Sequence, residues 1–344
     1  MTIKVGIIGA GAIARHRHLP ETFGNPFAEV GAVCDLTLSR AEEMTAQYGG
    51  KAYSDYHDML ADESIDAVIV AATNTTHASM TIAALEAGKH VLCEKPMATT
   101  LDDARKMMKA SLKSGKKLMI AHNQRLEAAH IKAKEIIQSG KLGKVYTFRS
   151  IFGHPGCEDW AIDGENTWFF RKEVTGLGTL GDLAIHKLDV IRWILEDDYT
   201  EASAFIDILE KTYPDGKQIN VEDNAICLLR TKKGVMGTMV ASWTYRKEDN
   251  STYIYCEKGV LSLYAHPEYS VMVDYDHERG EYHKVGKKST NVEQVKSGII
   301  DAFVDCIIND TEPPIPGIEG YKALEVVVAC LESAHSRQIV TIKA

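Results

Sequence analysis

The pattern Gly9-Ala10-Gly11-Ala12-Ile13-Ala14 constrains the fold of this chain more than any other feature. It follows the apolar segment Lys4–Gly9, a predicted strand, and a helix is expected to begin near Gly11. In a G-x-G-x-x-A turn the first glycine permits a tight bend, the second lets the backbone approach a pyrophosphate, and the small last residue lets helix and strand pack closely. Free N–H groups at the helix start attract the phosphates. The residues expected to contact a dinucleotide here are Gly9, Gly11, Ala12 and Ile13.

The rest of the first 123 residues repeats this alternation of strand and helix. The expected strands are Val30–Cys34, Asp66–Ala72, His90–Cys93 and Lys117–Ala121, and the expected helices are Ser39–Tyr48, Thr76–Ala87 and Leu101–Ser114. Apolar strands separated by helices are typical of a parallel sheet that is covered on both faces. Residues 1–123 are therefore predicted to form an α/β Rossmann domain with a parallel, doubly wound sheet.

The pattern changes in residues 124–344, where longer strands of alternating polarity outnumber the helices. The expected strands are Val145–Ile151, Ala202–Leu209, Asn224–Thr231, Val235–Tyr245, Tyr253–Cys256, Val260–Tyr264 and Ser270–Asp274. Helices are expected near Ala128–Ser139, Asp182–Leu195, Val292–Ile308 and Ile318–Ser336. This succession predicts an α+β domain with a mostly antiparallel sheet. The length of 344 residues fits two domains of about 150 residues each.

Charge and cysteine content exclude several classes of protein. The 39 Lys and Arg residues against 48 Asp and Glu residues give a net charge of −9, which disfavours nucleic acid or an anionic membrane as a partner. No apolar run approaches the roughly 18–20 residues of a membrane helix. The seven cysteines are odd in number and contain no C-x-x-C pair, which disfavours a disulfide framework and a zinc site. We therefore expect a protein of the reducing cytoplasm.

Asp35 is the residue that most constrains the choice of dinucleotide. It stands at the end of the second expected strand, 21 residues after Ala14, where a carboxylate accepts hydrogen bonds from a ribose diol. A carboxylate there favours NAD, because it repels the 2′-phosphate of NADP. Arg40 lies close by and could hold that phosphate instead. The expected cofactor is NAD, with NADP as the alternative.

Two further motifs carry groups suited to proton and hydride chemistry. Lys95, in Glu94-Lys95-Pro96, follows a buried strand, and ligands bind at the carboxyl ends of such strands. Asp182 and His186 are four residues apart at the start of an expected helix, so they share a face. A histidine can accept a hydroxyl proton while a hydride leaves the carbon. Taken singly, these residues are better explained as a surface ion pair, a helix cap and a surface histidine.

Together, the order and spacing of these motifs resemble the glucose–fructose oxidoreductase / inositol dehydrogenase / rhizopine-catabolism (Gfo/Idh/MocA) family over essentially the whole chain. The stretches that carry the resemblance are Val5–Ala14, Thr73–His77, Ala84–Met97 and Gly181–His186. The resemblance implies a Rossmann domain, a second domain with a large open sheet, and NAD(P)-dependent oxidation or reduction of a sugar, polyol or cyclitol.

The resemblance also assigns roles to individual residues. It implies that Lys95, Asp182 and His186 are the catalytic residues. It places on the cofactor side Thr73, Asn74, His77, Glu94 and Asn123. Arg125 would lie near the nicotinamide as a substrate contact. Three positions depart from the family pattern: Ala14 replaces a glycine, Thr73 stands where proline is frequent, and Gly176-Leu177-Gly178 replaces a triple glycine. The last change faces the substrate, so the resemblance does not identify the sugar.

The segment from 154 to 171, which we call the cleft segment, supplies further substrate candidates. His154, Trp160 and Trp168 lie among several carboxylates, and aromatic faces with carboxylates suit a sugar ring. The alternative is a surface loop whose tryptophans pack on the sheet. A metal site built from His154, Glu158, Asp182 and His186 lacks ligand spacing beyond the last pair, so no metal is expected.

These residues predict a dehydrogenase in which His186 takes the hydroxyl proton and Lys95 stabilises the alkoxide, while Asp182 orients His186 or binds a neighbouring hydroxyl. Two alternatives share the fold. One is a glycoside hydrolase that uses NAD transiently, and the other is a non-catalytic NAD(P)-sensing protein, which the complete reactive set disfavours. We also expect a homodimer or homotetramer formed through the C-terminal sheet, because a sheet with helices on one face leaves the other to bury.

Overall fold

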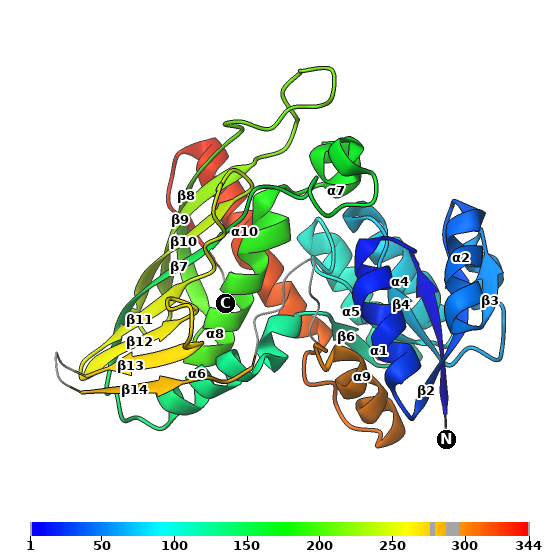
Figure 1. The fold of residues 1–344 in the computed structure, drawn as a ribbon, viewed down its shortest axis with the longest axis horizontal. Coiled ribbons are helices and arrows are strands. Elements are labelled where there is room, and N and C mark those ends of the chain that lie inside the picture. Colours follow the sequence, from blue (N-terminus) through cyan, green and yellow to red (C-terminus); the bar gives the residue numbers. More distant parts are fainter. Residues whose placement is uncertain (1, 276–278, 287–295, 343–344) are drawn as a thin grey trace.

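Two β-sheets with their helices make up the protein in a computed structural model, which describes residues 2–275, 279–286 and 296–342 (Figure 1). The first sheet has the order β3-β2-β1-β4-β5-β6 within the described residues, and all its neighbours are parallel. Its strands are β1 Ile3–Ile8, β2 Ala28–Cys34, β3 Lys51–Tyr53, β4 Ala67–Val70, β5 His90–Cys93 and β6 Leu118–Ile120. The strand order reverses between β1 and β4, which is where a doubly wound sheet binds its ligand.

Helices follow the strands of this sheet as the alternating pattern predicts. They are α1 Leu19–Gly24, α2 Leu38–Tyr48, α3 Tyr56–Leu60, α4 His77–Glu86 and α5 Leu101–Ser114. The predicted Rossmann fold is therefore confirmed. Two details differ: the chain after Gly11 winds as a π-helical turn, Ala14–His18, before α1 begins, and the short β3 and α3 were not predicted. Elements of three and five residues are too short to show a hydrophobic period.

The second sheet has the order β14-β13-β12-β11-β7-β10-β9-β8-β15 within the described residues. Its neighbours are antiparallel except for the parallel pair β7 and β10. Its strands are β7 Val145–Gly153, β8 Tyr199–Asp207, β9 Asn224–Thr231, β10 Met236–Ser242, β11 Thr252–Cys256, β12 Gly259–Leu263, β13 Val271–Asp274, β14 Gly280–His283 and β15 Val340–Thr341. The large, mostly antiparallel sheet is confirmed, and the short edge strands β14 and β15 were not predicted.

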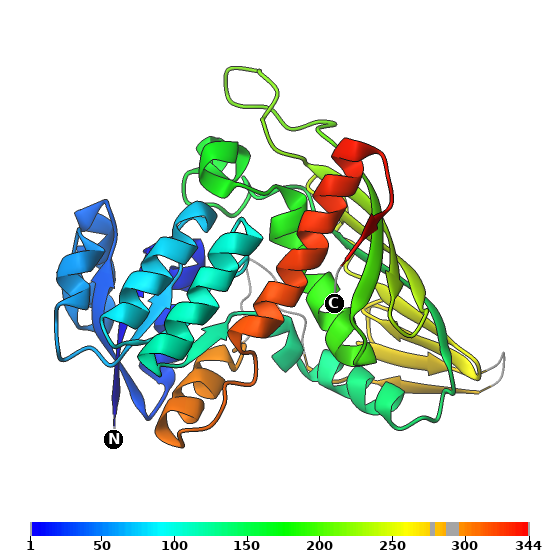
Figure 2. The same ribbon diagram turned by 180° about the vertical axis from the view of Figure 1, so that it is seen from behind.

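Helices α6 Ala128–Gln138, α8 Ile185–Leu195 and α10 Gly317–Ser336 cover the face of this sheet that looks toward the first domain (Figure 1). The short α7, Lys172–Thr175, lies beside the loop that follows β4. Helix α9, Ile299–Ile308, packs beside α1 instead (Figure 1), and Figure 2 shows α9 from behind, near the start of α10. The helix predicted for Val292–Ile308 thus begins at Ile299, and residues 292–295 lie outside the described residues.

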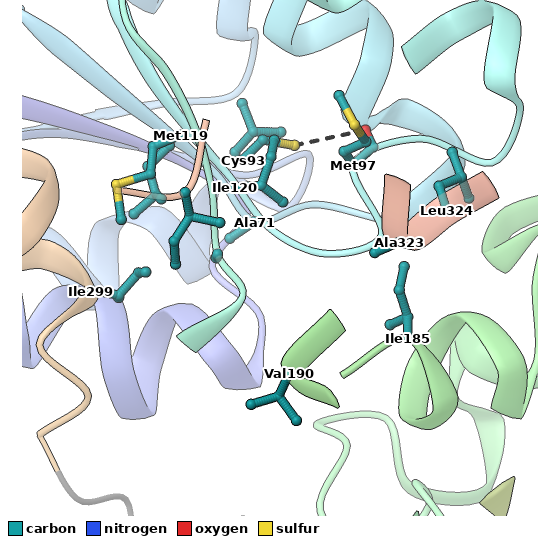
Figure 3. Packing of buried hydrophobic residues seen from close by; sticks show 14 of the residues in the cluster. Ala71, Cys93, Met97, Met119, Ile120, Ile185, Val190, Ile299, Ala323 and Leu324 are labelled. Carbon is teal, nitrogen blue, oxygen red and sulfur yellow. Dashed lines mark hydrogen bonds between the residues drawn. The ribbon is translucent and has the colours of Figure 1, made fainter. Parts of the chain in front are cut away.

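The two sheets share one apolar core, in which α10 is the common element. Ile120 and Met97 come from the first domain, and Ala323 and Leu324 of α10 belong to the same buried cluster (Figure 3). Gly320 allows this approach, because a Cβ there would lie 2.8 Å from Cγ1 of Ile120. This packing fixes the carboxyl ends of the parallel strands opposite the second domain. The boundary between residues 123 and 124 remains a prediction. In the part of the chain that the structure describes, no helix is long and apolar enough to cross a membrane.

Candidate active site

A cleft of about 640 Å³ lies between the two domains, at the carboxyl ends of the parallel strands. Seventeen of the eighteen residues that sequence reasoning assigned to the site line it, from both domains. They are Gly9, Gly11, Ala12, Ile13, Asp35, Arg40, Thr73, Asn74, His77, Glu94, Lys95, Asn123, His154, Trp160, Trp168, Asp182 and His186. The exception is Arg125.

Arg125 lies behind the cleft in a buried ion-pair network. Its Nε and Nη2 donate to the Asp189 carboxylate of α8 at 2.7 and 2.5 Å, and Nη2 also donates to Glu319 of α10 at 2.7 Å. The two carboxylates hold the Arg125 guanidinium in this position, because breaking a buried ion pair would leave an uncompensated charge. Arg125 therefore joins the helices behind the site, and we do not retain it as a substrate contact.

The glycine turn leaves room for a pyrophosphate. Gly9 has a φ of +98°, and a Cβ there would lie 2.5 Å from the Ala71 carbonyl oxygen, so a larger residue would be both strained and crowded. A Cβ on Gly11 would meet no heavy atom within 4 Å, although the residue lines the cleft. The backbone at Gly11 therefore faces open space, as the approach of a dinucleotide phosphate requires. The residues present fit the cofactor that the fold implies.

Asp35 is fixed at the end of β2 by two backbone amides. Its Oδ2 accepts a hydrogen bond from Ala10 N at 2.9 Å, and its Oδ1 accepts one from Thr37 N at 2.9 Å. Each carboxylate oxygen keeps a second lone pair for a ribose hydroxyl. Arg40 of α2 donates from Nη2 to Oδ1 of Asp163 at 2.8 Å, so it contacts the cleft segment of the other domain.

The loops after β4 and β5 are tied to each other and to the second domain. The Asn74 side-chain amide donates to the Thr175 carbonyl oxygen of the second domain at 3.0 Å. His77 lies with Nδ1 2.8 Å from the Pro96 carbonyl oxygen and Nε2 3.1 Å from that of Ala72. Burial lowers the pKa of His77, so the ring braces these loops as a largely neutral group.

Glu94 positions the backbone of the residue that follows it. Its Oε1 lies 2.9 Å from His18 Nε2, and its Oε2 accepts a hydrogen bond from Lys95 N at 3.1 Å. Burial alone would raise the pKa of Glu94, but the His18 contact and the charges of Arg17 and Lys95 lower it to about 2. The carboxylate is therefore ionised at neutral pH and holds Lys95 at the cleft.

Lys95 and Asp182 meet across the domain junction. Lys95 Nζ donates to Oδ1 of Asp182 at 2.8 Å and to its backbone oxygen at 2.9 Å. The second carboxylate oxygen, Oδ2, accepts from Nε1 of Trp243 at 3.1 Å. Asp182 is thus oriented by Lys95 and by the fully buried Trp243. Its carboxylate holds the Lys95 ammonium group, whereas the two predicted roles, orienting His186 or binding a neighbouring hydroxyl, stay predictions.

His186 is the second residue of α8, which directly follows the π-helical turn Leu180–Ala184. Burial and the positive charges of Lys95, His122 and Arg17 lower its pKa well below the ordinary 6.5. The imidazole is therefore neutral at pH 7, which is the form that can accept a proton. Its Nδ1 is buried and has no hydrogen-bond partner within the described residues.

The tryptophans of the cleft segment line the cleft and also pack against the second domain. Trp168 stacks on Phe169 with ring centroids 3.9 Å apart, and Trp160 meets the same ring edge-on at 5.1 Å. The ring of Phe169 in turn meets that of Trp243 edge-on, with centroids 6.4 Å apart. The two predicted alternatives, contact with a ligand and packing on the sheet, are therefore compatible. Among residues 2–275, 279–286 and 296–342, no group of three His, Cys, Asp or Glu side chains could hold a metal ion.

Several lining residues were missed by sequence reasoning. They are His16, Arg17, Tyr56, Gln124, Glu127, Phe152, Glu248 and Asn250, and Trp243 supports the site from behind. The run Arg15-His16-Arg17-His18 carried a signal, because four basic residues after a glycine turn suit an anionic ligand. The remaining residues come from segments that are mostly distant in the sequence, and no local pattern marks them.

A Rossmann sheet whose glycine turn faces a cleft, opposite a lysine, a carboxylate and a neutral histidine, is typical of nicotinamide-dependent oxidoreductases. Family models agree with this class. Residues 3–122 match the GFO_IDH_MocA oxidoreductase family with an NAD-binding Rossmann fold, and residues 130–262 match the GFO/IDH/MocA C-terminal domain. The chain belongs to this family, which confirms the resemblance and the expected NAD-binding domain.

Comparison with individual proteins agrees with this assignment. The chain is 32% identical to the 1,5-anhydro-D-fructose reductase of Ensifer adhaerens over 264 residues, which cover 74% of each chain. It is 27% identical to the inositol 2-dehydrogenase/D-chiro-inositol 3-dehydrogenase of Shouchella clausii, over 98% of this chain and 93% of that one. The crystal structure of an NAD binding oxidoreductase from Klebsiella pneumoniae superposes with a TM-score of 0.85 at 25% identity, over the full length of both chains.

Proposed function

We propose that this protein transfers a hydride between NAD and a hydroxyl-bearing or keto carbon of a sugar, polyol or cyclitol. The observation that carries the proposal is the placement of Lys95, held by Asp182, in the same cleft as a neutral His186. The names of the relatives, a reductase of an anhydro-sugar and an inositol dehydrogenase, support the substrate class.

The side chains of the cleft divide the reaction between them. In the oxidation direction, the neutral imidazole of His186 accepts the substrate hydroxyl proton. The Lys95 ammonium group donates a hydrogen bond to the oxygen as negative charge develops there, and Asp182 keeps that group in place. Bound NAD supplies the hydride acceptor. The hydroxyl oxygen gives its proton to His186 while the carbon that bears it gives up a hydride, which bound NAD would accept, and the carbon–oxygen bond becomes a carbonyl.

We expect that kcat/KM for oxidation does not fall through protonation of His186 until the pH is below about 6.5. The pKa of the imidazole lies well below its usual 6.5, so the base is lost only as the pH falls through that lower pKa. The measurement is kcat/KM for oxidation across roughly pH 4.5–8, with stability checked at each pH. An acid limb centred above pH 6.5 that disappears in His186→Ala would contradict the assigned protonation state.

The experiment that tests the proposed function is a panel of sugars, polyols and cyclitols with NAD and NADP, followed at the absorbance of reduced nicotinamide. We expect reduction with at least one neutral polyhydroxy substrate. Free sugar released from a glycoside without net reduction would favour the hydrolase alternative. Cofactor binding without turnover of any substrate would favour the sensing alternative.

We also propose that the protein is a homodimer or homotetramer that buries the open face of the second sheet. Cross-strand partners share a face, and Phe205 on β8 stands opposite Ile226 on β9. Phe205 is 81% exposed and Ile226 is 53% exposed. The large apolar side chains of this face are Phe205, Ile226, Leu228, Met236, Tyr255 and Tyr282. Exposed large apolar side chains gathered on one face of a sheet are typical of a protein–protein interface.

A charge on that face is expected to lower the oligomeric mass. Ile226→Asp would bring an unpaired carboxylate into the centre of a buried interface, and desolvation of that charge opposes assembly. The mass is read by light scattering during gel filtration. The matched control is Leu112→Asp, on the exposed surface of α5, where the side chain is 86% exposed. An identical mass for wild type and Ile226→Asp would contradict burial of this face.

We propose a cytoplasmic location for the enzyme. Its seven cysteines are all free thiols in the structure, and six of them are buried. Buried free thiols suit a reducing compartment, where no disulfide framework is needed for stability.

A further inference from the structure

Asp163 connects the second domain to the part of the cleft where the ribose binds. It lies on the cleft segment, and its Oδ1 accepts a hydrogen bond from Arg40 Nη2 at 2.8 Å. Arg40 belongs to α2 of the first domain, and its backbone N donates to Thr37, which in turn donates to Asp35. Both members of the ion pair line the cleft. The Asp163 carboxylate of the second domain is therefore paired with the Arg40 guanidinium of the first domain. Arg40 follows closely after Asp35, the residue expected to bind the ribose.

The negative charges near Arg40 disfavour the binding of a 2′-phosphate. Asp35 and Asp163 are both carboxylates, and a phosphate monoester adds about −1.5 to −2 charges at neutral pH. A guanidinium is the group best suited to hold such a phosphate, but Arg40 is already paired. Arg15, in the π-helical turn Ala14–His18, donates to the Ala10 carbonyl oxygen at 2.9 Å and pairs with Glu43 at 2.8 Å. NAD, with a neutral 2′-hydroxyl group, does not compete with Asp163 for Arg40.

We propose that Asp163 is a specificity-determining residue, which makes the cleft prefer NAD over NADP by holding Arg40 from the opposite domain. The inference rests on the proposed function, in that the dinucleotide lies across the glycine turn and Asp35. NADP has to displace Asp163 to reach Arg40, whereas NAD binds with the pair intact. Cofactor choice is thus set jointly by the end of β2 and by a residue about 130 positions later, in the substrate-side domain.

The effect of the Arg40–Asp163 pair on the choice between NAD and NADP can be measured by binding alone, without turnover. Trp160 and Trp168 lie on the cleft segment with Asp163 and line the cleft. Displacing Asp163 from Arg40 releases the segment from α2, so tryptophan fluorescence is expected to differ between the NAD and NADP complexes of the wild-type enzyme. Fluorescence titration therefore gives the dissociation constants, and the plateau signal reports how the segment lies in each complex.

The test is the change Asp163→Asn in the full-length protein, with Kd for NAD and for NADP measured by calorimetry and by tryptophan fluorescence. Removing the carboxylate frees Arg40 and removes a repulsive charge, so NADP should bind on the order of 10-fold more tightly. Kd for NAD should change by less than about 3-fold, because an exposed ion pair contributes little to stability. Glu165→Gln is the matched control, since it removes the same charge from an exposed position on the same segment. Its affinity ratio should equal that of wild type.

Two double variants identify the phosphate partner. Adding Arg40→Gln to Asp163→Asn should abolish the gain in NADP affinity. Adding Arg171→Gln, which removes the guanidinium of the cleft segment itself, should leave the gain in place. An unchanged NADP-to-NAD ratio in Asp163→Asn, with both dinucleotides bound, would overturn this inference alone. Loss of the gain through Arg171→Gln would overturn the role of Arg40. Binding of neither dinucleotide by wild type would overturn the proposed function itself.

Discussion

Replacing His186 with alanine is expected to lower kcat for oxidation by a factor on the order of 10²–10⁴, which is the usual contribution of a positioned general base. The imidazole is neutral because burial and the cations around it depress its pKa, so wild type holds the base in its active form at pH 7. The variant keeps the glycine turn and Asp35, so Kd for NAD should change little. The measurement is kcat with the best substrate of the panel, together with Kd for NAD from fluorescence.

Two controls separate a chemical role from a structural one. Added imidazole should restore part of the activity of His186→Ala, because the substitution leaves space for a diffusible base in the cleft. His90→Ala changes a histidine outside the cleft lining and should retain wild-type kcat. A His186→Ala enzyme with wild-type kcat on the true substrate would remove His186 from the mechanism.

Replacing Lys95 with methionine is expected to lower kcat/KM by a factor on the order of 10²–10³, the usual effect of losing one donor to a developing oxyanion. The change also leaves the Asp182 carboxylate without its cation in a nearly buried position. We therefore expect a lower melting temperature as well. Adding Asp182→Asn to Lys95→Met removes the unpaired charge, so the double variant should regain stability but not activity.

Lys89→Met provides the matched control for a buried lysine. Lys89 Nζ donates to the carbonyl oxygens of Asp62 and Ile65 at 2.9 and 2.8 Å, and the residue does not line the cleft. Its loss should lower the melting temperature and leave kcat near the wild-type value. Equal losses of kcat in Lys89→Met and Lys95→Met would mean that Lys95 acts through stability rather than through the substrate.

Most of the fold could be predicted because its long elements carry strong local patterns. The strand β4 and residues 91–93 of β5 are continuous apolar runs, and α5 begins and ends where Thr100 and Gly115 cap it. The first helix begins at Ala12, close to the expected Gly11, but its π-helical winding at Ala14–His18 could not be predicted, since a π-helical turn has no distinct sequence period. The short edge strand β15 exists through its pairing with β8, and no feature of two residues could indicate it.

The site was predictable to the extent that its residues fall in contiguous motifs. Gly9, Glu94, Lys95 and His186 all stand in such stretches and line the cleft. What the sequence could not supply were contacts between distant segments. Trp243 orients Asp182 across 61 positions. Arg125, which lies two positions after the cleft-lining Asn123, is instead turned into the core by Asp189 and Glu319. The Arg40–Asp163 pair likewise depends on how the two domains meet.

The most direct test of the central claim follows deuterium from the substrate to the cofactor. The substrate identified by the panel is labelled on the carbon that bears the reacting hydroxyl group and is incubated with NAD and wild-type enzyme. The account predicts one deuterium on the reduced nicotinamide for each carbonyl product formed, and a loss of this transfer by a factor on the order of 10²–10⁴ in His186→Ala. Deuterium retained in a released sugar, or exchanged into water without net reduced cofactor, would contradict a dehydrogenase that works through this site.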